Sequence, residues 1–525
     1  MNILKIILLN LLIFSFSYSS TFEELSSKLS DNSFKVKEDV LNELIINYKD
    51  EQRLEVLLQN MLLGNLYFQN QSNEILFLEK DSFKSLFTNN IISNASADDF
   101  SKVKINNKLR SVIKASLAKI NLFASDENKR LNAAKNILEN LEEQDKEIIL
   151  EALKSEKKSS IKDILLESLA NITAKFSSGD EQLKAISELG GFLSAKSLET
   201  LTGLKESNDE KIKEAVKNAL NEIELSKTFY SFIETAFFGL SQGSVLLLAA
   251  IGLAITFGVM KVINMAHGEL IMIGAYTTYT IQQLMPNLIE YSVIIAIPCA
   301  FIISGLVGIA IERLVIRHLY GRPLETLLAT FGISLILQQV VRTIFSPLNQ
   351  EVKTPSWMSG ALEINGALSL TYNRLYVVIF AFIVFFAILY VMKKTSLGLK
   401  VRAVSQNRPI ARAMGIQSSK IDAITFGIGS GIAGVAGVAL SQLTNVGPNL
   451  GQAYIVDSFM VVVFGGVGNL WGTLIASFTL GEINKFIEPL AGAILAKVII
   501  LVFIILFIQK RPRGLFPQKG RDAQD

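Results

Sequence analysis

Three polar residues, Asn264, His267 and Glu269, lie within a few positions of one another between two apolar runs. They belong to the stretch GLSQGSVLLLAAIGLAITFGVMKVINMAHGELIMIGAYTTY, residues 239–279. A charged group at the centre of a membrane costs roughly 2.5 to 3.5 kcal/mol on insertion scales, so polar residues placed between two spans line a path or brace the fold. His267 fits a packed or helix-capping residue as well as a pathway residue.

The sequence shows no motif for metal or nucleotide chemistry. The HGE triplet at His267 differs from the HExxH of a zinc protease, and His318 is the only other histidine. The Gly-x4-Gly-Lys-Ser/Thr phosphate loop is absent from the chain. We therefore expect a protein that is not an enzyme, with no catalytic residue, no metal and no cofactor.

The composition of the 525 residues is divided between two parts of the chain. All 10 prolines and both tryptophans come after residue 285, while most Lys, Glu, Asp and Asn come from residues 21–226. This length exceeds what one core usually supports, so we expect two domains. The net charge of +3 gives no reason to expect nucleic-acid binding. The single cysteine, Cys299, can form no internal disulfide.

The first 20 residues, MNILKIILLNLLIFSFSYSS, combine one early lysine, an apolar run and small residues near the end. This order predicts a secretory signal peptide, because the apolar run is short for a membrane span. An uncleaved N-terminal anchor is the alternative. In both cases we expect residues 21–226 to be exported.

Residues 21–226 predict an exported helical domain. Apolar residues recur every three or four positions in 21–62 and 109–225, with no proline. Between them, LYFQNQSNEILFLEKDSF and SKVKINN favour short strands or an irregular insertion. A shift of 51 positions places Leu150 on Leu201 and Ile161 on Ile212, which is typical of stacked, HEAT-like helical pairs. Such a domain serves as an adaptor or spacer, or docks a soluble partner that delivers substrate.

The second part predicts a polytopic membrane domain over residues 227–517, followed by a short tail over 518–525. Segments of about 20 apolar residues, enough to cross a bilayer, lie near 232–260, 265–284, 291–315, 324–345, 372–392, 421–441 and 490–508. A further apolar segment, 452–487, is interrupted by glycines that allow a hairpin. Glycines every three or four positions from Gly427 to Gly437 predict close helix packing.

Basic residues predict the sides of the membrane. They gather in three segments, near Arg313–Arg322, over Lys393–Lys420 and after Lys510. By the positive-inside rule these segments are cytoplasmic, which gives an outside N-terminal domain and an inside C-terminus. The segment 452–487 then crosses an even number of times, so we expect seven or nine crossings. The count also places Asn264, His267 and Glu269 near the cytoplasmic end of the first hairpin.

The cytoplasmic loop KKTSLGLKVRAVSQNRPIARAMGIQSSKID predicts a short helix. Asn407 lies near its cap, Pro409 suits its first turn, and Gly415 can end it. A short helix with charged flanks between two spans is suited to a cleft in a cytoplasmic partner. An anchoring loop that only satisfies the positive-inside rule is the alternative.

These segments resemble the permeases of ABC importers for branched-chain amino acids and urea, over about residues 232–517. The resemblance rests on GLAITFGVMKVINMAHGELIMIGAYTTY, SLGLKVRAVSQNRPIARAMGI, DSFMVVVFGGVGNLWGT and RPRGLFP. The form GVMKVINMAHGELIMIGAY, joined to an exported helical extension, resembles the urea-type B permease more than the amino-acid type. Pro409 and Ile410 stand where the family often has acidic and alanine residues.

The resemblance implies an inner-membrane permease subunit that passes urea by alternating access. Its implied partners are a homologous second permease, two cytoplasmic ATPases and a periplasmic solute-binding protein, with lipid around it. By similarity the ATPase coupling loop includes Arg402, Asn407, Ala411 and Gly415. A path for a small neutral polar solute needs a few amide, hydroxyl or indole groups. The candidates for path or gate are Asn264, His267, Glu269, Tyr276, Asn445, Gln452, Asn469 and Trp471.

Two alternatives stay open. The first is a branched-chain amino acid permease of the same class, for which a zwitterionic solute favours charges of both signs in the path. Glu269 and Asp457 supply only a negative charge. The second is a passive or ion-coupled channel with an exported regulatory domain, against which the coupling-loop pattern argues.

Overall fold

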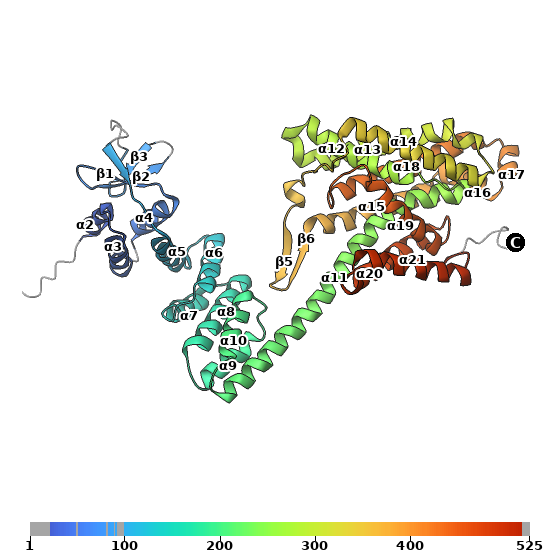
Figure 1. Ribbon diagram of the computed structural model, residues 1–525. Coiled ribbons are helices and arrows are strands. Elements are labelled where there is room, and N and C mark those ends of the chain that lie inside the picture. The colour runs from blue at the N-terminus through green and yellow to red at the C-terminus, as the bar shows by residue number, and fades with distance from the viewer. Residues whose placement is uncertain (1–20, 49–50, 80–81, 89, 92–98, 517–525) are drawn as a thin grey trace, which may run out of the picture. The chain divides into compact units, whose positions relative to one another are not determined.

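The computed structural model describes residues 21–48, 51–79, 82–88, 90–91 and 99–516 (Figure 1). The chain divides into two compact units, one ending at Ser226 and the other beginning at Lys227. The expected signal peptide, residues 1–20, lies outside the described residues, as does the tail 518–525.

The first unit begins with helices packed against a small antiparallel sheet. The helices are α2 (Phe22–Ser27), a 3-10 turn (Lys28–Ser30), α3 (Phe34–Asn47) and α4 (Gln52–Leu63). The strands are β1 (Leu66–Gln69), β2 (Ile75–Glu79), β3 (Ser82–Ser85) and β4 (Phe100–Lys102), in the order β3-β2-β1-β4. The expected strands are therefore present. Leu41, Leu57, Leu66 and Ile75 join both elements in one core.

The rest of the first unit is a series of helices. They are α5 (Asn107–Asn121), α6 (Glu127–Glu139), α7 (Asp145–Ser155), α8 (Ser159–Phe176), α9 (Asp180–Leu189), α10 (Ala195–Leu204) and the start of α11 (Glu210–Met260). The repeated segments each form a helix, a polar turn and a second helix: α7 with α8, and α10 with α11. Ile161 is buried in its core, and Leu201 and Ile223 share another.

The second unit is a bundle of helices. It contains the rest of α11 and then α12 (His267–Leu284), α13 (Ile289–Leu314), α14 (Pro323–Phe345), α15 (Tyr372–Lys394), α16 (Ser396–Gln406), α17 (Arg408–Ala413), α18 (Ser418–Ser441), α19 (Leu450–Gly465), α20 (Leu470–Ala491) and α21 (Ala493–Lys510). Short 3-10 turns cover Pro286–Leu288, Ile316–His318 and Ser356–Met358. Each segment expected to span the membrane is helical.

Six helical segments among the described residues are long and apolar enough to cross a bilayer. They are Glu210–Met260, Pro286–His318, Pro323–Phe345, Tyr372–Lys394, Ser418–Ser441 and Ala493–Lys510. The glycine-interrupted segment forms two helices, α19 and α20, joined by a turn in which Gly466 has φ +104° and Gly468 φ +76°. These φ values favour glycine, which explains why the chain turns there.

Close packing at glycine holds the centre of the bundle. α18 packs against both α12 and α13. A Cβ on Gly274 would meet the backbone of Gly434, and one on Gly431 would lie 2.8 Å from the carbonyl oxygen of Phe301. Small residues at such positions let helix backbones approach, as the sequence predicts for this stretch.

One hairpin in the second unit was not expected from the sequence. β5 (Ala361–Asn365) and β6 (Leu368–Thr371) form a two-stranded antiparallel sheet. The signal was present, because Asn365-Gly366 between alternating apolar residues favours a tight hairpin turn. Figure 1 shows this hairpin at the opposite end of the unit from α17.

Candidate functional site

The first candidate site is the junction between α11 and α12. α11 ends at Met260, Lys261 takes a positive φ of 53°, and residues 261–266 are not helical. The side-chain oxygen of Asn264 accepts a hydrogen bond from the backbone N–H of Ala266 at 3.0 Å. This short turn of Asx type leads into α12 at His267.

His267 bonds far back along α11. Its Nε2 donates to the carbonyl oxygen of Ala249 at 2.9 Å, which fixes the tautomer because a carbonyl can only accept. Ala249 lies 11 residues before the end of α11 at Met260 (260 − 249). At 1.5 Å per residue, this is about 16 Å from the helix end. Residues 261–266 therefore return along α11 toward its middle.

The contacts of Glu269 show that the junction lies equally deep relative to a second helix, α14. Its Oε1 accepts from Ser334 Oγ at 2.9 Å and from Gln338 Nε2 at 2.7 Å, both on α14. Ser334 lies 11 residues after the start of α14 at Pro323 (334 − 323), again about 16 Å. The expectation that the triplet lies near the end of the first hairpin is therefore wrong. Counting spans in the sequence could not predict this depth. Residues 261–266 run back along α11 toward the middle of the bundle, and they do so without forming another span.

The junction is packed rather than open. Asn264, His267 and Glu269 are at most 1 % exposed. A Cβ on Gly268 would lie 2.8 Å from the carbonyl carbon of Gly451, so the start of α12 touches the start of α19 backbone to backbone. The first turn of α12 is thus held on three sides, by α11, α14 and α19. These hydrogen bonds and backbone contacts hold the first turn of α12 in place.

The other expected path residues do not form a single group. Tyr276 is buried, with its ring centre 4.8 Å from that of Phe345. Asn445 and Gln452 are exposed, the first in the loop after α18 and the second in the first turn of α19. Asn469 caps α20 by accepting from the backbone N–H groups of Trp471 and Gly472 at 3.1 and 3.2 Å.

Asn469 and Trp471 do share one cavity with Arg402, a residue of the expected coupling loop. The cavity has a volume of about 720 Å³. It lies where α11, α15 and α16 meet the turn before α20 and the segment after α21. Trp471 is half-exposed and its ring packs edge-on against Phe385 at 5.4 Å.

The expected coupling loop folds as two helices, where the sequence predicted one. α16 begins at a Thr395 cap, and α17 follows with Asn407 Oδ1 accepting from the N–H of Ile410 at 3.0 Å. Gly415 has φ +84°, which ends α17 as expected. Ala411 packs against Val401, Val404 and Ile421, while Arg402 is exposed.

A charged clamp, Arg408–Asp422–Tyr320, fixes this loop and was missed in the sequence. The two Nη atoms of Arg408 donate to the two carboxylate oxygens of Asp422, both at 2.8 Å. The guanidinium lies 4.0 Å from the centre of the Tyr320 ring, whose hydroxyl accepts from Nη2. Bidentate and stacked arginine contacts are strong and directional. The clamp therefore ties α17 to α18 and to the segment before α14.

The clamp is largely buried, which affects the protonation of the Tyr320 hydroxyl. The Asp422 side chain is 3 % exposed and that of Arg408 22 %. Burial, with Asp422 nearby, raises the pKa of the Tyr320 hydroxyl, so this group stays protonated. No helical or strand periodicity relates Arg408 to Asp422, and Arg408 was one of many basic residues in its loop. Their pairing is visible only in three dimensions.

Comparison with known proteins identifies the family of the second unit. Residues 235–508 match the model of the "Branched-chain amino acid transport system / permease component" family, which is more than half of the chain. The chain belongs to this family. The match begins after the first unit and covers the helices that carry the junction, the cavity and the clamp.

Individual relatives agree. The chain is 28 % identical over 297 residues to the high-affinity branched-chain amino acid permease protein BraD of Pseudomonas aeruginosa, covering 54 % of this chain and 96 % of the relative. It is 30 % identical over 302 residues to LivH of Salmonella typhimurium, covering 55 % and 97 %. The ribose import permease protein RbsC of Escherichia coli is 26 % identical over 291 residues, covering 54 % and 86 %. No solved structure matches the chain.

Members of this family are permease components and not enzymes, so this chain is a membrane permease subunit. The segment GLSQG, residues 239–243, has the spacing of a nucleophile elbow. It lies inside α11, however, whereas an elbow needs a strand-to-helix turn that exposes the serine.

Proposed function

We propose that this chain is a permease subunit of an ATP-driven importer for branched-chain amino acids. The match of residues 235–508 to that family, with relatives of the same name over nearly their full length, carries the proposal. Urea, which we favoured from the sequence, is the less supported solute, because the family model and the nearer of these relatives name branched-chain amino acids.

The proposed partners are those that the resemblance to ABC importers implies, and the match to the permease family supports them. Two cytoplasmic ATPases would supply the work, a periplasmic solute-binding protein would deliver the solute, and a homologous permease would complete the path. The helices α16 and α17 form the proposed ATPase docking element, with Arg402, Asn407, Ala411 and Gly415 in or beside it. The clamp supports this role, because it connects the element to α18, which packs on α12 and α13.

The proposed orientation follows from the basic helix ends. Arg313, Lys393 and Lys510 lie in the last turns of α13, α15 and α21. We call this the basic end of the second unit and propose that it is cytoplasmic. The first unit is then periplasmic after a signal peptide over residues 1–20. With α19 and α20 as two spans the chain crosses nine times, and with them as a re-entrant pair seven times.

We propose separate roles for the eight path candidates. Asn445 and Gln452 face the solute, because their amides are exposed near the start of α19. Asn264, His267, Glu269 and Tyr276 instead position α12, because they are buried and packed. Asn469 and Trp471 belong to the cavity at the basic end.

The first unit is proposed to be an adaptor for a soluble partner, such as the solute-binding protein. Its paired helices α7–α8 and α10–α11 support a HEAT-like arrangement. Stacked helical pairs expose extended faces suited to binding another protein.

Uptake by a strain that lacks this chain tests the proposal. We expect loss of energy-dependent uptake of labelled leucine, isoleucine and valine at low concentration, with uptake of labelled urea unchanged. Expression of the wild-type chain should restore amino acid uptake. Loss of urea uptake with normal leucine uptake would instead support urea, and loss of neither would contradict the importer role.

A further inference from the structure

The cavity of about 720 Å³ at the basic end is basic at its rim and apolar at its inner wall. Its rim carries three exposed basic side chains from three elements: Lys393 in α15, Arg402 in α16 and Arg513 after α21. Its inner wall is apolar and includes Ala254, which lies 6 residues before the end of α11 (260 − 254). At 1.5 Å per residue, the wall reaches about 9 Å along α11.

The walls of this cavity are fixed by hydrogen bonds between elements. Ser405 Oγ of α16 donates to the carbonyl oxygen of Gly258 in α11 at 3.0 Å. The segment after α21 is held by the N–H of Leu515, which donates to Phe464 O at 2.9 Å, and by Asn469, which donates to Phe516 O at 3.2 Å. The cavity is therefore a built feature of the fold.

The charge of the cavity indicates what kind of molecule fits it. Of the described residues that line it, three are basic and none is acidic. A zwitterionic amino acid would place its ammonium group beside these basic side chains, and no described residue that lines the cavity offers a carboxylate to pair it, which is unfavourable. A soluble anion would leave the apolar inner wall unused. An amphiphilic anion matches both the rim and the wall.

We propose that this cavity binds an anionic phospholipid of the leaflet at the basic end. The phosphate would lie among Lys393, Arg402 and Arg513, and the first part of an acyl chain would lie along the wall that includes Ala254 and Trp471. Basic pockets between membrane helices are suited to anionic headgroups. The assignment does not depend on which solute the permease carries. It removes Asn469 and Trp471 from the solute path, and it assigns Arg402 to the lipid rather than to the ATPase contact.

The chain has its own reporter for this site. It contains two tryptophans, so a Trp357→Phe variant leaves Trp471, in the cavity wall, as the single indole. This variant of the full chain would be placed in phosphatidylcholine nanodiscs with brominated phosphatidylglycerol or brominated phosphatidylcholine at equal mole fractions. We expect the anionic lipid to quench Trp471 at a severalfold lower mole fraction than the neutral lipid.

Substitutions at the rim test the charge. Arg402→Gln, Arg513→Gln and Lys393→Gln should each weaken quenching by phosphatidylglycerol about fivefold, from the usual worth of one basic residue near a lipid surface. Lys394→Gln is the matched control, because Lys394 is exposed at the same helix end but does not line the cavity. Phospholipid that copurifies with each variant, measured by native mass spectrometry, gives a second readout that does not depend on fluorescence.

The outcomes separate the possible ligands. Equal quenching by both lipids, or quenching that the three rim variants leave unchanged, would overturn the proposal. If glycerol phosphate relieves the quenching as effectively as short-chain phosphatidylglycerol does, the site binds a soluble phosphate instead. Relief by leucine would return the cavity to the solute path. If Arg402→Gln does not fold, the other two variants decide.

Discussion

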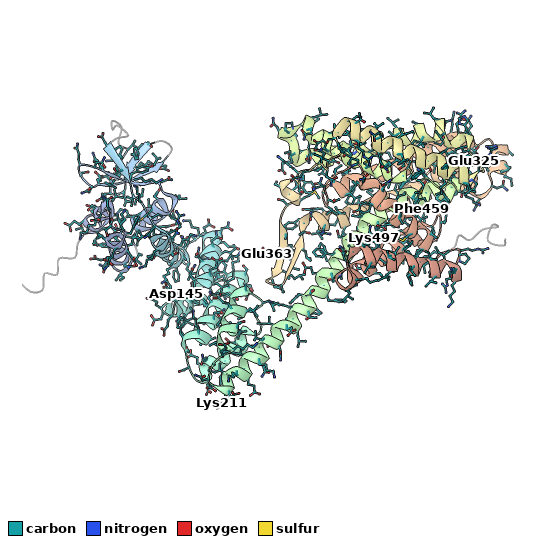
Figure 2. All side chains as sticks on the ribbon, viewed as in Figure 1. Asp145, Lys211, Glu325, Glu363, Phe459 and Lys497 are labelled. Carbon is teal, nitrogen blue, oxygen red and sulfur yellow. The ribbon has the colours of Figure 1, made fainter. Side chains whose placement is uncertain are left out.

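The junction at the start of α12 and the clamp at Arg408 solve different problems with polar side chains. At the junction, Glu269 is 1 % exposed and accepts hydrogen bonds from two neutral groups, Ser334 and Gln338. At the clamp, Asp422 is as deeply buried but faces a guanidinium through two bonds. The junction lies about 16 Å from the ends of α11 and α14. The clamp lies where loops meet helix ends; Figure 2 labels Glu325 at this end of the unit, in the first turn of α14.

This difference shows two ways in which a buried carboxyl group is held in the same unit. At the junction, neutral hydrogen-bond donors and close glycine contacts fix α12, and no described residue forms an ion pair with Glu269. Near the helix ends, a charged pair holds α17, which is part of the proposed ATPase docking element. We therefore expect packing changes to be most harmful at the junction, and charge changes at the clamp.

The largest expected effect is a packing change at the junction. Gly268→Ala places a Cβ 2.8 Å from the carbonyl carbon of Gly451, and neither backbone can yield easily. We expect a loss of about 3 kcal/mol in stability, at the upper end for overpacking. Thermal unfolding of the full chain in detergent measures it. Gly332→Ala in α14 is the control, because its Cβ would meet nothing within 4 Å; equal effects would refute the close contact.

The next largest effect should come from removing Arg408 from the clamp, which should reduce the coupling of ATP hydrolysis to transport. Arg408→Ala leaves Asp422 buried and unpaired, which costs on the order of 2 to 3 kcal/mol in a partly exposed pair. We expect ATP hydrolysis by the assembled importer to continue while solute transport per ATP falls at least tenfold. The double variant Arg408→Asp with Asp422→Arg should recover part of the lost transport per ATP. Lys420→Ala, an exposed residue beside the clamp, should have no effect. Normal coupling in Arg408→Ala would remove the clamp from this role.

The first unit also contains an ion pair between an arginine and a buried carboxylate. Arg130 donates to Glu156 at 2.8 Å, and Glu156 also accepts from the N–H groups of Lys157 and Lys158. These bonds, that from Arg130 first, lower the pKa of Glu156 to about 2 from an ordinary 4.5. The folded pKa is depressed, so its stabilisation is complete above pH 4.5 and is lost as the pH falls toward 2.

This pH dependence is checked by hydrogen exchange of peptides covering 145–176 in the full chain. At each pH, wild type is compared with Glu156→Gln. We expect the variant to be less protected above pH 4.5 and the difference to disappear near pH 2. Lys184→Gln, which alters an exposed pair with Glu188 at 3.9 Å, serves as the control and should show little difference. A Glu156→Gln difference that persists to pH 2 would show that the carboxylate charge is not the cause.

The smallest expected effect comes from Tyr320→Phe. The ring that stacks on Arg408 remains, and one hydroxyl contact is lost. A single such bond contributes about 0.5 to 1.5 kcal/mol. Transport per ATP should fall no more than a few fold, and Tyr320→Ala should fall further because the stacking is lost too. If Tyr320→Phe is as harmful as Arg408→Ala, the hydroxyl rather than the ion pair holds α17.

The sequence predicts the helices well because their signals are local. Apolar runs predicted the helices of the second unit, Asn407 and Gly415 predicted the ends of α17, and glycines predicted the turn between α19 and α20. The β5–β6 hairpin was missed although Asn365-Gly366 is a local signal.

The depth of the junction and the partner of Arg408 could not be predicted in this way. The first depends on where residues 261–266 run against α11, and the second on two segments meeting in three dimensions. His267 and Glu269 have a local signal, because polar residues are rare within an apolar run. Arg408 and Asp422 gave no such signal, because charges are common in a loop between spans.

The most direct test of the account is one pair of isosteric neutralisations, Glu269→Gln and Asp422→Asn, compared in ATP-driven leucine uptake by the reconstituted importer. The amide oxygen of Gln can still accept from Ser334 and Gln338, so Glu269→Gln should keep uptake within about twofold of wild type. Asp422→Asn loses a charge-assisted bidentate pair worth more than about 1.4 kcal/mol, so uptake should fall more than tenfold. A severe loss in Glu269→Gln with normal uptake in Asp422→Asn would contradict the account.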